Sequence, residues 1–317
     1  MKILVTGCAG FIGSKVSELL LDTGSSVTGV DNLNDCYSSQ LKLWRLDRLR
    51  KRSNFEFRKT DISSLEAIRD LFRSGGFDAA INLAARVGVR ASIEDPFIYY
   101  DTNVRGTLNL LECCAKFGTP KFLQASSSSV YGAIAVPFRE TDPTDQVLSP
   151  YAASKKSAEV LAHSFHHIYG IDVTVLRFFT VYGPAGRPDM AYFKFISSIC
   201  KGEPVQIFGD GRQKRDFTYI DDIADGVLRG LRSVGFEAIN LGNSSPVEIL
   251  TVVEMIERLI QKKARLVFLP TQNADAPTTW ACIDKANSIL GWKPTVDIAT
   301  GIEATVEWHL EHERDLV

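Results

Sequence analysis

Tyr151 and Lys155 are the residues whose types and spacing point most clearly to chemistry in this sequence. They belong to the segment SPYAASK at residues 149–155, in which Ser149 is a typical N-cap and Pro150 a typical first helical residue. A helix that begins there places the phenol and the ammonium one turn apart on the same face. A neighbouring cation favours the phenolate over the phenol, whose ordinary pKa is ~10, so the pair can serve as a general base near neutral pH. The same spacing also occurs on solvated surface helices, and the catalytic interpretation therefore depends on the rest of the chain.

A glycine-rich loop near the start of the chain indicates a site for a dinucleotide. Residues 2–6 read as a short apolar strand, the loop GCAGFIG follows at residues 7–13, and a helix is expected to run from it to Asp22. Glycine permits the tight turn, the close approach of a pyrophosphate to backbone N–H groups and close helix–strand packing, while the helix dipole favours negative charge. The contacts expected from this loop are Gly7, Gly10, Phe11, Ile12 and Gly13.

Acidic and small residues after the next strands complete the expected cofactor site. A second strand at residues 26–30 ends in Asp31, where a carboxylate can accept hydrogen bonds from the adenosine ribose. That negative charge favours NAD over NADP, whose 2′-phosphate it would repel. Asn103 reads either as a functional residue or as a buried asparagine satisfied by its neighbours. The further cofactor contacts are expected to be Asn32, Asp61, Ile62, Leu83, Ala84, Ala85 and Asn103.

Strands that alternate with helices predict an α/β fold with a doubly wound parallel sheet of the Rossmann type. Strands are expected at residues 2–6, 26–30, 55–58, 78–83, 121–125 and 171–177, and a long helical pattern covers residues 95–117. Right-handed crossovers bring the chain back to the same edge each time, and ligands of such sheets bind beyond the carboxyl ends of the strands. A run of serines at residues 126–129 stands at that end of the fifth strand.

The alternating pattern breaks after residue 178, and we place a change of domain there. Shorter pieces follow, with expected helices near residues 248–261 and 301–311 and a strand at 265–269. A strand near residue 238 is expected to return to the main sheet. We therefore predict an NAD-binding domain of residues 1–180 to which 216–243 return. A smaller, interleaved C-terminal substrate-binding domain would comprise residues 181–215 and 244–317.

Two polar patterns have competing interpretations. Residues 41–52 (LKLWRLDRLRKR) form a basic amphipathic helix, which could bind a phosphate or an acidic partner. A solvated cationic face over Leu41, Trp44 and Leu49 is the favoured interpretation. Histidines at 163, 166 and 167 and at 309 and 312 have spacings that can ligate metal, but no carboxylate or cysteine completes a set. They are expected to be exposed or to face a partner.

Composition limits the classes of function. The chain has 317 residues, a formal net charge of −2 and 45% hydrophobic residues, and its pI is near 6.2. No global positive field exists to hold nucleic acid or an anionic membrane. The sequence has no apolar run long enough for a membrane span and leads directly into a strand, so a cytoplasmic location is expected. Its six cysteines lack zinc or Cys-x-x-Cys spacing, and neither disulfides nor a metal are expected.

The glycine loop, Asp31, the serine run and the Tyr151–Lys155 pair together resemble the extended short-chain dehydrogenase/reductase family, also described as NAD-dependent epimerases and dehydratases. Within it, the segments VPFRETDPTDQ, SPYAASKKSAE, RFFTVYGPAGRPDMAYF and RDFTYIDDI look like those of UDP-glucuronate 4-epimerases. The similarity runs from Met1 to about Trp292, and residues 126–222 carry its most specific part. The chain departs from common residues of the family at Cys8, Arg86, Gln272 and Cys282.

The resemblance implies NAD-dependent 4-epimerisation of a UDP-sugar, UDP-glucuronate to UDP-galacturonate, through a transient 4-keto intermediate. Tyr151 would take the proton from the 4-hydroxyl while the hydride passes to NAD, and Ser127 would hydrogen-bond the same oxygen. Lys155 would hold the nicotinamide ribose and the phenolate. Thr180 and Arg215 would contact the diphosphate, and Arg187 the glucuronate carboxylate. The substrate contacts implied are Arg90, Ser127, Ser128, Thr180, Arg187, Met190, Arg215 and Asp275.

Related functions remain as alternatives. Dehydratases of the family carry an Asp-Glu pair after the active-site serine, and decarboxylases of UDP-glucuronate carry a glutamate there. This chain has Ser128 and Ser129, so elimination or decarboxylation lacks its proton handler and epimerisation is favoured. An epimerase of a neutral UDP-sugar is the enzymatic alternative, and a non-catalytic NAD-sensing protein is the alternative from another class. The family also implies a homodimer formed by the helices at 95–117 and 149–170.

Overall fold

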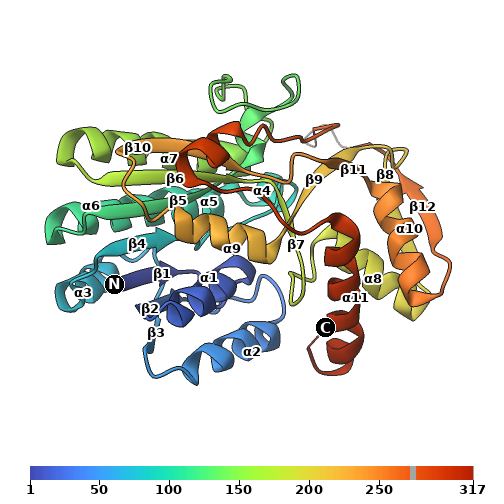
Figure 1. The fold of residues 1–317 in the computed structure, drawn as a ribbon, viewed down its shortest axis with the longest axis horizontal. Helices are drawn as coiled ribbons and strands as arrows, with labels where there is room; N and C mark the ends of the chain where they lie inside the picture. The colour runs from blue at the N-terminus through green and yellow to red at the C-terminus, as the bar shows by residue number, and fades with distance from the viewer. Residues whose placement is uncertain (272–275, 317) are drawn as a thin grey trace.

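The computed structural model describes residues 1–271 and 276–316 of the chain. Its centre is a seven-stranded parallel sheet with the strand order β10-β6-β5-β4-β1-β2-β3 (Figure 1). The strands are β1 (Lys2–Thr6), β2 (Ser26–Asp31), β3 (Phe55–Lys59), β4 (Ala79–Asn82), β5 (Lys121–Ser127), β6 (Asp172–Phe178) and β10 (Phe236–Leu241). The predicted doubly wound fold is confirmed.

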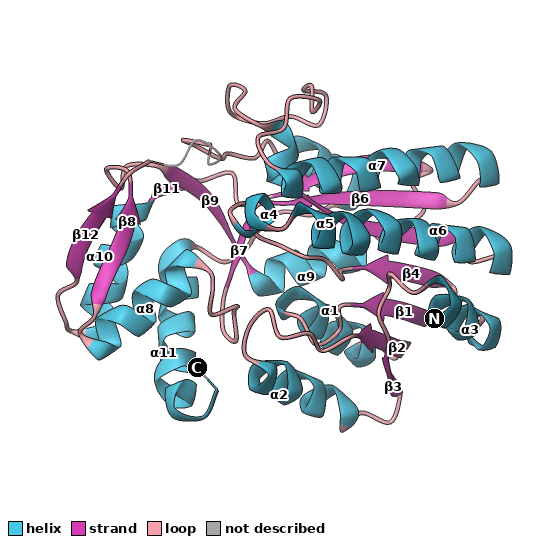
Figure 2. Ribbon diagram, turned by 180° about the vertical axis from the view of Figure 1, so that it is seen from behind, coloured by secondary structure: helices cyan, strands magenta, loops and turns pink. Residues whose placement is uncertain are grey.

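Helices cover both faces of this sheet, because successive residues of a strand point to opposite sides. Ile3 and Val5 pack into one core with α1 and α9, whereas Leu4 packs into the other with α3 and α6. Figure 1 shows α1 and α9 in front of the sheet, and Figure 2 shows α6 and α7 on the opposite face. The helices are α1 (Phe11–Asp22), α2 (Ser39–Arg50), α3 (Leu65–Gly75), α6 (Gly106–Phe117), α7 (Pro150–Tyr169) and α9 (Ile220–Arg229).

The long helical pattern at residues 95–117 forms three consecutive segments. Asp95 accepts a hydrogen bond from the Ile98 N–H and Pro96 is the first residue of α5 (Pro96–Tyr99), so this segment starts as expected for a capped helix. A π-helical turn, η1 (Tyr100–Arg105), then leads into α6, and a short helix α4 (Ala91–Glu94) precedes them. The turn contains Asn103, whose side chain is held from two sides. Such π-turns are frequent near functional sites.

Two small sheets and the helices α8, α10 and α11 lie together at one side of the main sheet (Figure 1). Strands β7 (Thr180–Tyr182), β9 (Lys214–Tyr219) and β11 (Pro246–Glu248) form one sheet, and β8 (Pro204–Phe208) pairs with β12 (Arg265–Leu269). The helices are α8 (Ala191–Lys201), α10 (Ile249–Ile260) and α11 (Ile298–Leu316). The chain leaves the main sheet after β6 and returns to it with α9 and β10.

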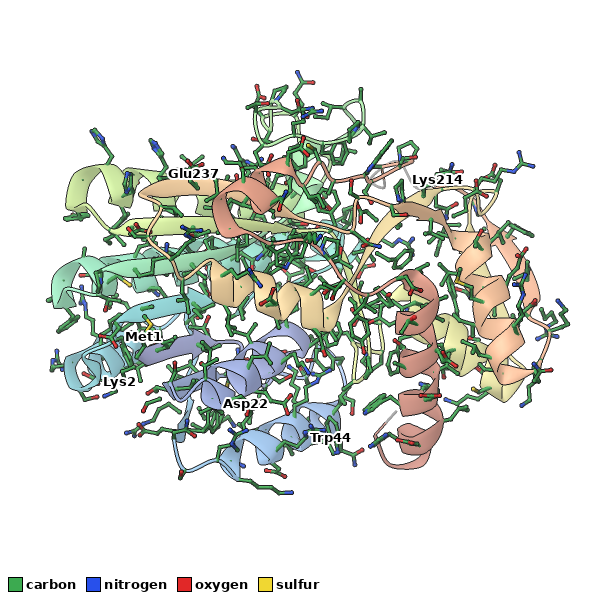
Figure 3. All side chains as sticks on the ribbon, in the orientation of Figure 1. Met1, Lys2, Asp22, Trp44, Lys214 and Glu237 are labelled. Carbon is green, nitrogen blue, oxygen red and sulfur yellow. The ribbon has the colours of Figure 1, made fainter. Side chains whose placement is uncertain are left out.

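Helix α2 contacts both β3 of the main sheet and α11. Trp44, labelled in Figure 3, lies on the side of α2 toward α11, where its ring contacts that of Trp308 with centroids 5.7 Å apart. The expectation of a solvated cationic face on this helix is wrong for two of its cations. Lys42 and Arg45 are only 4% and 2% exposed, because their charged ends hydrogen-bond to loop oxygens. Arg48 remains exposed, as predicted.

Candidate active site

A cavity of about 1280 Å³ lies beyond the carboxyl ends of the main-sheet strands and is also lined by residues of α8, β8 and β9. This position agrees with the rule for ligand sites of open α/β sheets. The predicted site residues that border it are Gly7, Gly10, Phe11, Ile12, Gly13, Asp31, Asn32, Asp61, Ile62, Leu83, Ala84, Ala85, Arg90, Ser127, Ser128, Tyr151, Lys155, Thr180, Arg187, Met190 and Arg215. Asp275 lies outside the described residues. Asn103 is not among the lining residues.

Asn103 lies behind the cavity wall and hydrogen-bonds to the backbone of Arg86, between the lining residues Ala85 and Val87. Its side-chain oxygen accepts the N–H of Arg86 at 2.8 Å, and its amide donates to the Arg86 carbonyl at 3.0 Å and to the Ser154 hydroxyl at 2.9 Å. Asn103 is 2% exposed. The structural interpretation of this residue therefore fits these contacts, and Asn103 supports the segment that follows Ala84 and Ala85.

The glycine loop is shaped for a ligand with phosphate groups. Gly7 has φ = +71°, and a Cβ there would lie 2.8 Å from the backbone nitrogen of Ala84, so only glycine fits without displacing the wall. Helix α1 begins after Gly10 with no side-chain cap, and the first N–H groups of the helix lack an intrahelical partner. Free N–H groups at a helix N-terminus bind phosphate well.

Two carboxylates, those of Asp31 and Asp61, line the part of the cavity near the glycine loop. Asp31, at the end of β2, accepts hydrogen bonds from the N–H groups of Ala9 at 3.2 Å and Leu33 at 2.8 Å. These bonds fix the carboxylate next to the glycine loop. Burial alone would raise the pKa of Asp61, but hydrogen bonds from Ser63 and Asn32 outweigh burial and hold that pKa below its usual value. The Asp61 carboxylate therefore remains an acceptor for hydrogen-bond donors such as hydroxyl or amino groups.

Tyr151 and Lys155 lie on α7 as predicted, with Ser149 accepting a hydrogen bond from the Ala152 N–H at 3.2 Å. Burial raises the pKa of Tyr151 above its usual value, while a hydrogen bond with Ser127 and the charge of Arg187 act in the opposite direction. The expected lowering of that pKa by Lys155 is therefore not found. The cause is burial, since desolvation disfavours the charged phenolate.

Lys155 is directed to the end of β5. Its Nζ donates to the Ala125 carbonyl at 2.9 Å, and the residue is 4% exposed. Burial lowers the pKa of Lys155 to about 8, although the charge of Glu159 raises it. The ammonium is thus anchored to the strand that carries Ser127, and the Tyr151 phenol has that serine as its hydrogen-bond partner. The three predicted catalytic residues are brought together in one wall of the cavity.

A buried polar network that the sequence did not predict supports this wall. Glu159, one turn after Lys155, binds the Arg177 guanidinium through both carboxylate oxygens, at 3.0 and 2.8 Å, and accepts the Ser126 hydroxyl at 2.5 Å. Arg177 also donates to the Tyr131 hydroxyl at 2.9 Å. Glu159 and Arg177 are each 4% exposed. The network therefore fixes the end of β5 against α7 and β6 directly below the candidate catalytic residues.

The arginines of the cavity differ in how they are held. The Arg187 guanidinium forms a two-point ion pair with Asp189, with Nε–Oδ1 and Nη2–Oδ2 distances of 2.9 and 2.6 Å. Burial would lower the pKa of Arg187, but Asp189 keeps it above its ordinary value. Arg215 donates to the Lys214 carbonyl at 2.9 Å, and the Arg90 guanidinium lies 3.6 Å from the centre of the Phe208 ring.

Asp216 ties the strand of Arg215 to two later segments of the chain. Its buried carboxylate accepts hydrogen bonds from the N–H groups of Asn243 at 2.6 Å, Ser244 at 3.1 Å and Ala281 at 2.8 Å. Burial raises the pKa of Asp216 to about 6, although these three N–H groups lower it. Asp216 belongs to the segment RDFTYIDDI, but the sequence does not predict its role, because its partners are backbone groups.

The part of the chain that the structure describes contains neither a metal-binding cluster nor a helix suited to span a membrane. Within residues 1–271 and 276–316, no cluster of three or more histidine, cysteine, aspartate or glutamate side chains has the arrangement of a metal site. The six cysteines, all in these ranges, are free thiols. None of the helices there combines the length and the apolar character that a bilayer span requires.

Comparisons with known proteins agree with this geometry. A UDP-glucuronate 4-epimerase from Thermodesulfobacterium geofontis is 51% identical over 310 residues, which cover 98% of this chain and 96% of that protein. A crystal structure of the Bacillus cereus UDP-glucuronic acid 4-epimerase with UDP-glucuronic acid and NAD has a TM-score of 0.93 and 38% identity, covering 98% of this chain and 99% of that one.

A neutral-sugar enzyme is also similar. The Thermotoga maritima UDP-glucose 4-epimerase with UDP-glucose has a TM-score of 0.91 and 30% identity, covering 99% of this chain and 100% of that one. The model of the NAD dependent epimerase/dehydratase family matches residues 3–242. The match extends from the glycine loop through the Tyr151–Lys155 pair to the end of β10. The chain belongs to the NAD dependent epimerase/dehydratase family.

Proposed function

We propose that this protein is an NAD-dependent UDP-glucuronate 4-epimerase, which interconverts UDP-glucuronate and UDP-galacturonate through a transient 4-keto sugar. The observation that carries the proposal is the grouping of Ser127, Tyr151 and Lys155 in one wall of a cavity with neutral Ser128 and Ser129 beside them. The two similar UDP-glucuronate 4-epimerases support the choice of sugar.

The cofactor part of the cavity fits a dinucleotide with an unmodified adenosine ribose. Uncapped N–H groups at the start of α1 suit the pyrophosphate, and Asp31 suits the ribose hydroxyls. Lys155 would hold the nicotinamide ribose. When bound, NAD would accept the hydrogen at C4 of the sugar as hydride and return it to the opposite face.

The side chains around the sugar move one proton and hold one oxygen. Tyr151 takes the proton from the 4-hydroxyl, and Ser127, its hydrogen-bond partner, donates to or accepts from the same oxygen. On the return step Tyr151 gives the proton back. Because Ser128 and Ser129 are neutral, the wall offers no carboxyl group at their positions to promote elimination.

The sugar carboxylate needs separate control. A 4-keto-uronate is a β-keto acid. It loses carbon dioxide when the bond between C5 and the carboxylate carbon aligns with the π system of the 4-keto group. We assign Arg187 the role of holding the carboxylate away from that alignment, since a buried carboxylate requires charge-assisted partners. Asp189 neutralises part of the Arg187 charge and fixes its plane, so the arginine acts mainly by orienting the carboxylate.

Product analysis by NMR tests the proposed reaction. Purified protein with its bound NAD is incubated with UDP-glucuronate, UDP-glucose and UDP-N-acetylglucosamine. We expect UDP-galacturonate from the first sugar at the highest kcat/KM, without UDP-pentose and without NADH that accumulates with each turnover. Equal or faster turnover of a neutral sugar would assign the chain to the neutral-sugar epimerases. No turnover of any of these sugars would contradict an epimerase function.

We also propose that the protein forms a homodimer through the outer face of α5, η1, α6 and α7. This face carries exposed apolar side chains whose exposed fractions are 81% for Phe97, 41% for Tyr100, 40% for Leu108, 58% for Val160 and 65% for Ile168. Figure 2 shows α6 and α7 side by side on this face. An apolar surface that extends over neighbouring helices is suited to a two-fold contact with a second copy.

Light scattering of two matched variants tests the dimer. The wild type should have about twice the 35.1 kDa mass of one chain. Phe97→Glu should give a monomer. Phe268→Glu, which introduces the same charge at a 54% exposed phenylalanine of β12, should remain a dimer. A wild-type mass of one chain, or a dimer of unchanged stability with Phe97→Glu, would contradict this interface.

A further inference from the structure

The Arg45 guanidinium connects the loop of the cofactor site with the loop of the substrate site. Its Nη1 donates to the Ala9 carbonyl at 3.2 Å and to the Tyr37 hydroxyl at 2.8 Å. Its Nη2 donates to the carbonyls of Ala185 at 2.6 Å and Gly186 at 3.2 Å. One amino group therefore hydrogen-bonds to the glycine loop, and the other hydrogen-bonds to the segment that leads into Arg187.

Tyr37 adds a second contact between the same two loops. Its ring centre lies 5.5 Å from the Arg45 guanidinium carbon and 5.4 Å from that of Arg187. The Lys42 ammonium lies 4.6 Å from the same ring. Tyr37 follows Asp31 in the loop after β2, so the proposed carboxylate contact rests on a residue from the cofactor side. Cations near an aromatic face are attracted to it, and the attraction is stronger when they are desolvated.

The backbone before Arg187 has a conformation that its residue types disfavour. Ala185 has φ = +54°, in the left-handed region that disfavours residues with a Cβ. A Cβ at Gly186 would lie 2.2 Å from the Tyr192 hydroxyl oxygen, so the loop passes that ring closely. Strained residues persist where the surroundings determine them strongly, and they cluster at functional sites. Here the surroundings include Arg45, which is bonded to the carbonyl of the strained residue itself.

We propose that Arg45 is a positioning residue that couples the dinucleotide loop to the Arg187 loop and thereby sets the preference for an acidic sugar. This inference rests on the proposed function, in which Arg187 orients the sugar carboxylate. Arg45 is not among the residues that border the cavity, so it would act on a ligand only through its neighbours. It acts by fixing the two carbonyls before Arg187 relative to Ala9.

A shorter cation separates this role from general support of the fold. Arg45→Lys retains the charge but replaces the two-sided guanidinium by a single ammonium, which cannot serve both loops in the same way. We expect the Kd for UDP-glucuronate to rise about tenfold, as for the loss of a charge-assisted hydrogen bond, with the Kd for UDP-glucose changed less than ~2-fold. Arg48→Lys is the matched control, because Arg48 lies on the same helix, exposed and paired with Glu18 at 3.2 Å.

Calorimetric titration of the NAD-loaded protein with each sugar nucleotide measures these constants without turnover. NAD content and melting temperature are measured on the same samples. A Kd ratio between the two sugars that is the same in wild type, Arg45→Lys and Arg48→Lys overturns the proposal. An equal loss of affinity for both sugars in Arg45→Lys also overturns it, because a merely structural role predicts that result.

Two further variants extend the test, and the first of them does not require Arg45→Lys to fold. Tyr37→Phe removes only the hydroxyl that accepts from Arg45 Nη1, and a rise of about 3-fold in the Kd for UDP-glucuronate alone is expected. An unchanged ratio overturns the proposal. In the Arg45→Lys protein, Ala185→Gly removes the Cβ penalty at φ = +54° and should recover part of the lost preference. Because binding is measured directly, absence of UDP-glucuronate turnover in the wild type contradicts the proposed function and leaves the coupling to be judged from the Kd ratios.

Discussion

Replacing Glu159 by glutamine removes one charge from the buried ion pair below the candidate catalytic residues. Arg177 would keep its positive charge at 4% exposure with no carboxylate to balance it. Loss of one partner from a buried pair typically lowers the free energy of unfolding by ~3–5 kcal/mol. The glutamine oxygen can still accept one hydrogen bond from Arg177, so we expect the lower end of this range, about 3 kcal/mol.

The same substitution should change the pH dependence of the reaction. Burial lowers the pKa of Lys155 to about 8, and the charge of Glu159 raises it against this effect. Glu159→Gln therefore lowers the Lys155 pKa further. If the Lys155 ammonium is the active form, the alkaline decline of kcat/KM, which reports ionisations of the free enzyme, moves to lower pH. A loss of packing alone would reduce activity without moving that decline.

Urea denaturation at pH 7 and a pH profile of kcat/KM measure both effects. Glu254→Gln is the control, since Glu254 pairs with Arg258 at 3.9 Å on the surface, with the two side chains 62% and 79% exposed. That variant should lose no more than ~0.5 kcal/mol and keep the wild-type profile. If Glu159→Gln lost as little as the control, the ion pair would not stabilise the site as argued. An unmoved alkaline decline would refute the electrostatic link to Lys155.

Three further predictions concern the reacting group, the cofactor loop and a buried carboxyl. Tyr151→Phe should lower kcat by ~10²–10⁴-fold with NAD content unchanged, and near-normal turnover would show that the phenol is not the proton carrier. Gly7→Ala should lose bound NAD, because its Cβ would clash with Ala84. The control Gly24→Ala, at φ = +82° with open space around it, should keep NAD and lose only ~1 kcal/mol of stability. Equal NAD contents in the two variants would refute the close-approach argument. The folded pKa of Asp216, about 6, lies above its unfolded value of ~3.9, so the folded state binds more protons in this window and the contribution of the group to stability falls as pH rises through it. Asp216→Asn removes this dependence, and the difference in unfolding free energy between wild type and variant, measured in urea, should be larger near pH ~4.5 than near pH 7; a difference independent of pH would contradict it.

Elements with a strong local pattern were predictable from the sequence. The sequence located all seven strands of the main sheet within about two residues of their observed ends. Buried strands such as β1 are continuously apolar, whereas the edge strand β3 (FEFRK) alternates apolar and charged residues. Ser149 and Pro150 located the start of α7. The short strands β7 and β11, each of three residues, left no such pattern. Their pairing with β9 decides their conformation.

Buried charges were the part of the site that sequence patterns did not predict. Arg45 looked solvated because α2 carries many cations, and its partners in the Ala185 segment are backbone carbonyls about 140 positions away. Every residue has a backbone carbonyl, so a pattern of residue types cannot show which carbonyl will accept the hydrogen bond. The same holds for Asp216, whose partners are backbone N–H groups. The Tyr151–Lys155 spacing predicted which residues meet, but the effect of burial on their pKa values depends on the complete fold.

The late return of β10 to the main sheet affects how the chain can assemble on the ribosome. Strand β6 ends at Phe178, and its outer edge is covered only when β10, at Phe236–Leu241, has been made. Synthesis of the roughly 60 residues between them takes about 3–12 s at ordinary elongation rates. During that time the nascent sheet presents an unpaired edge, which favours pairing with other chains. The main sheet is therefore completed only after β7, α8, β8 and β9 have been made.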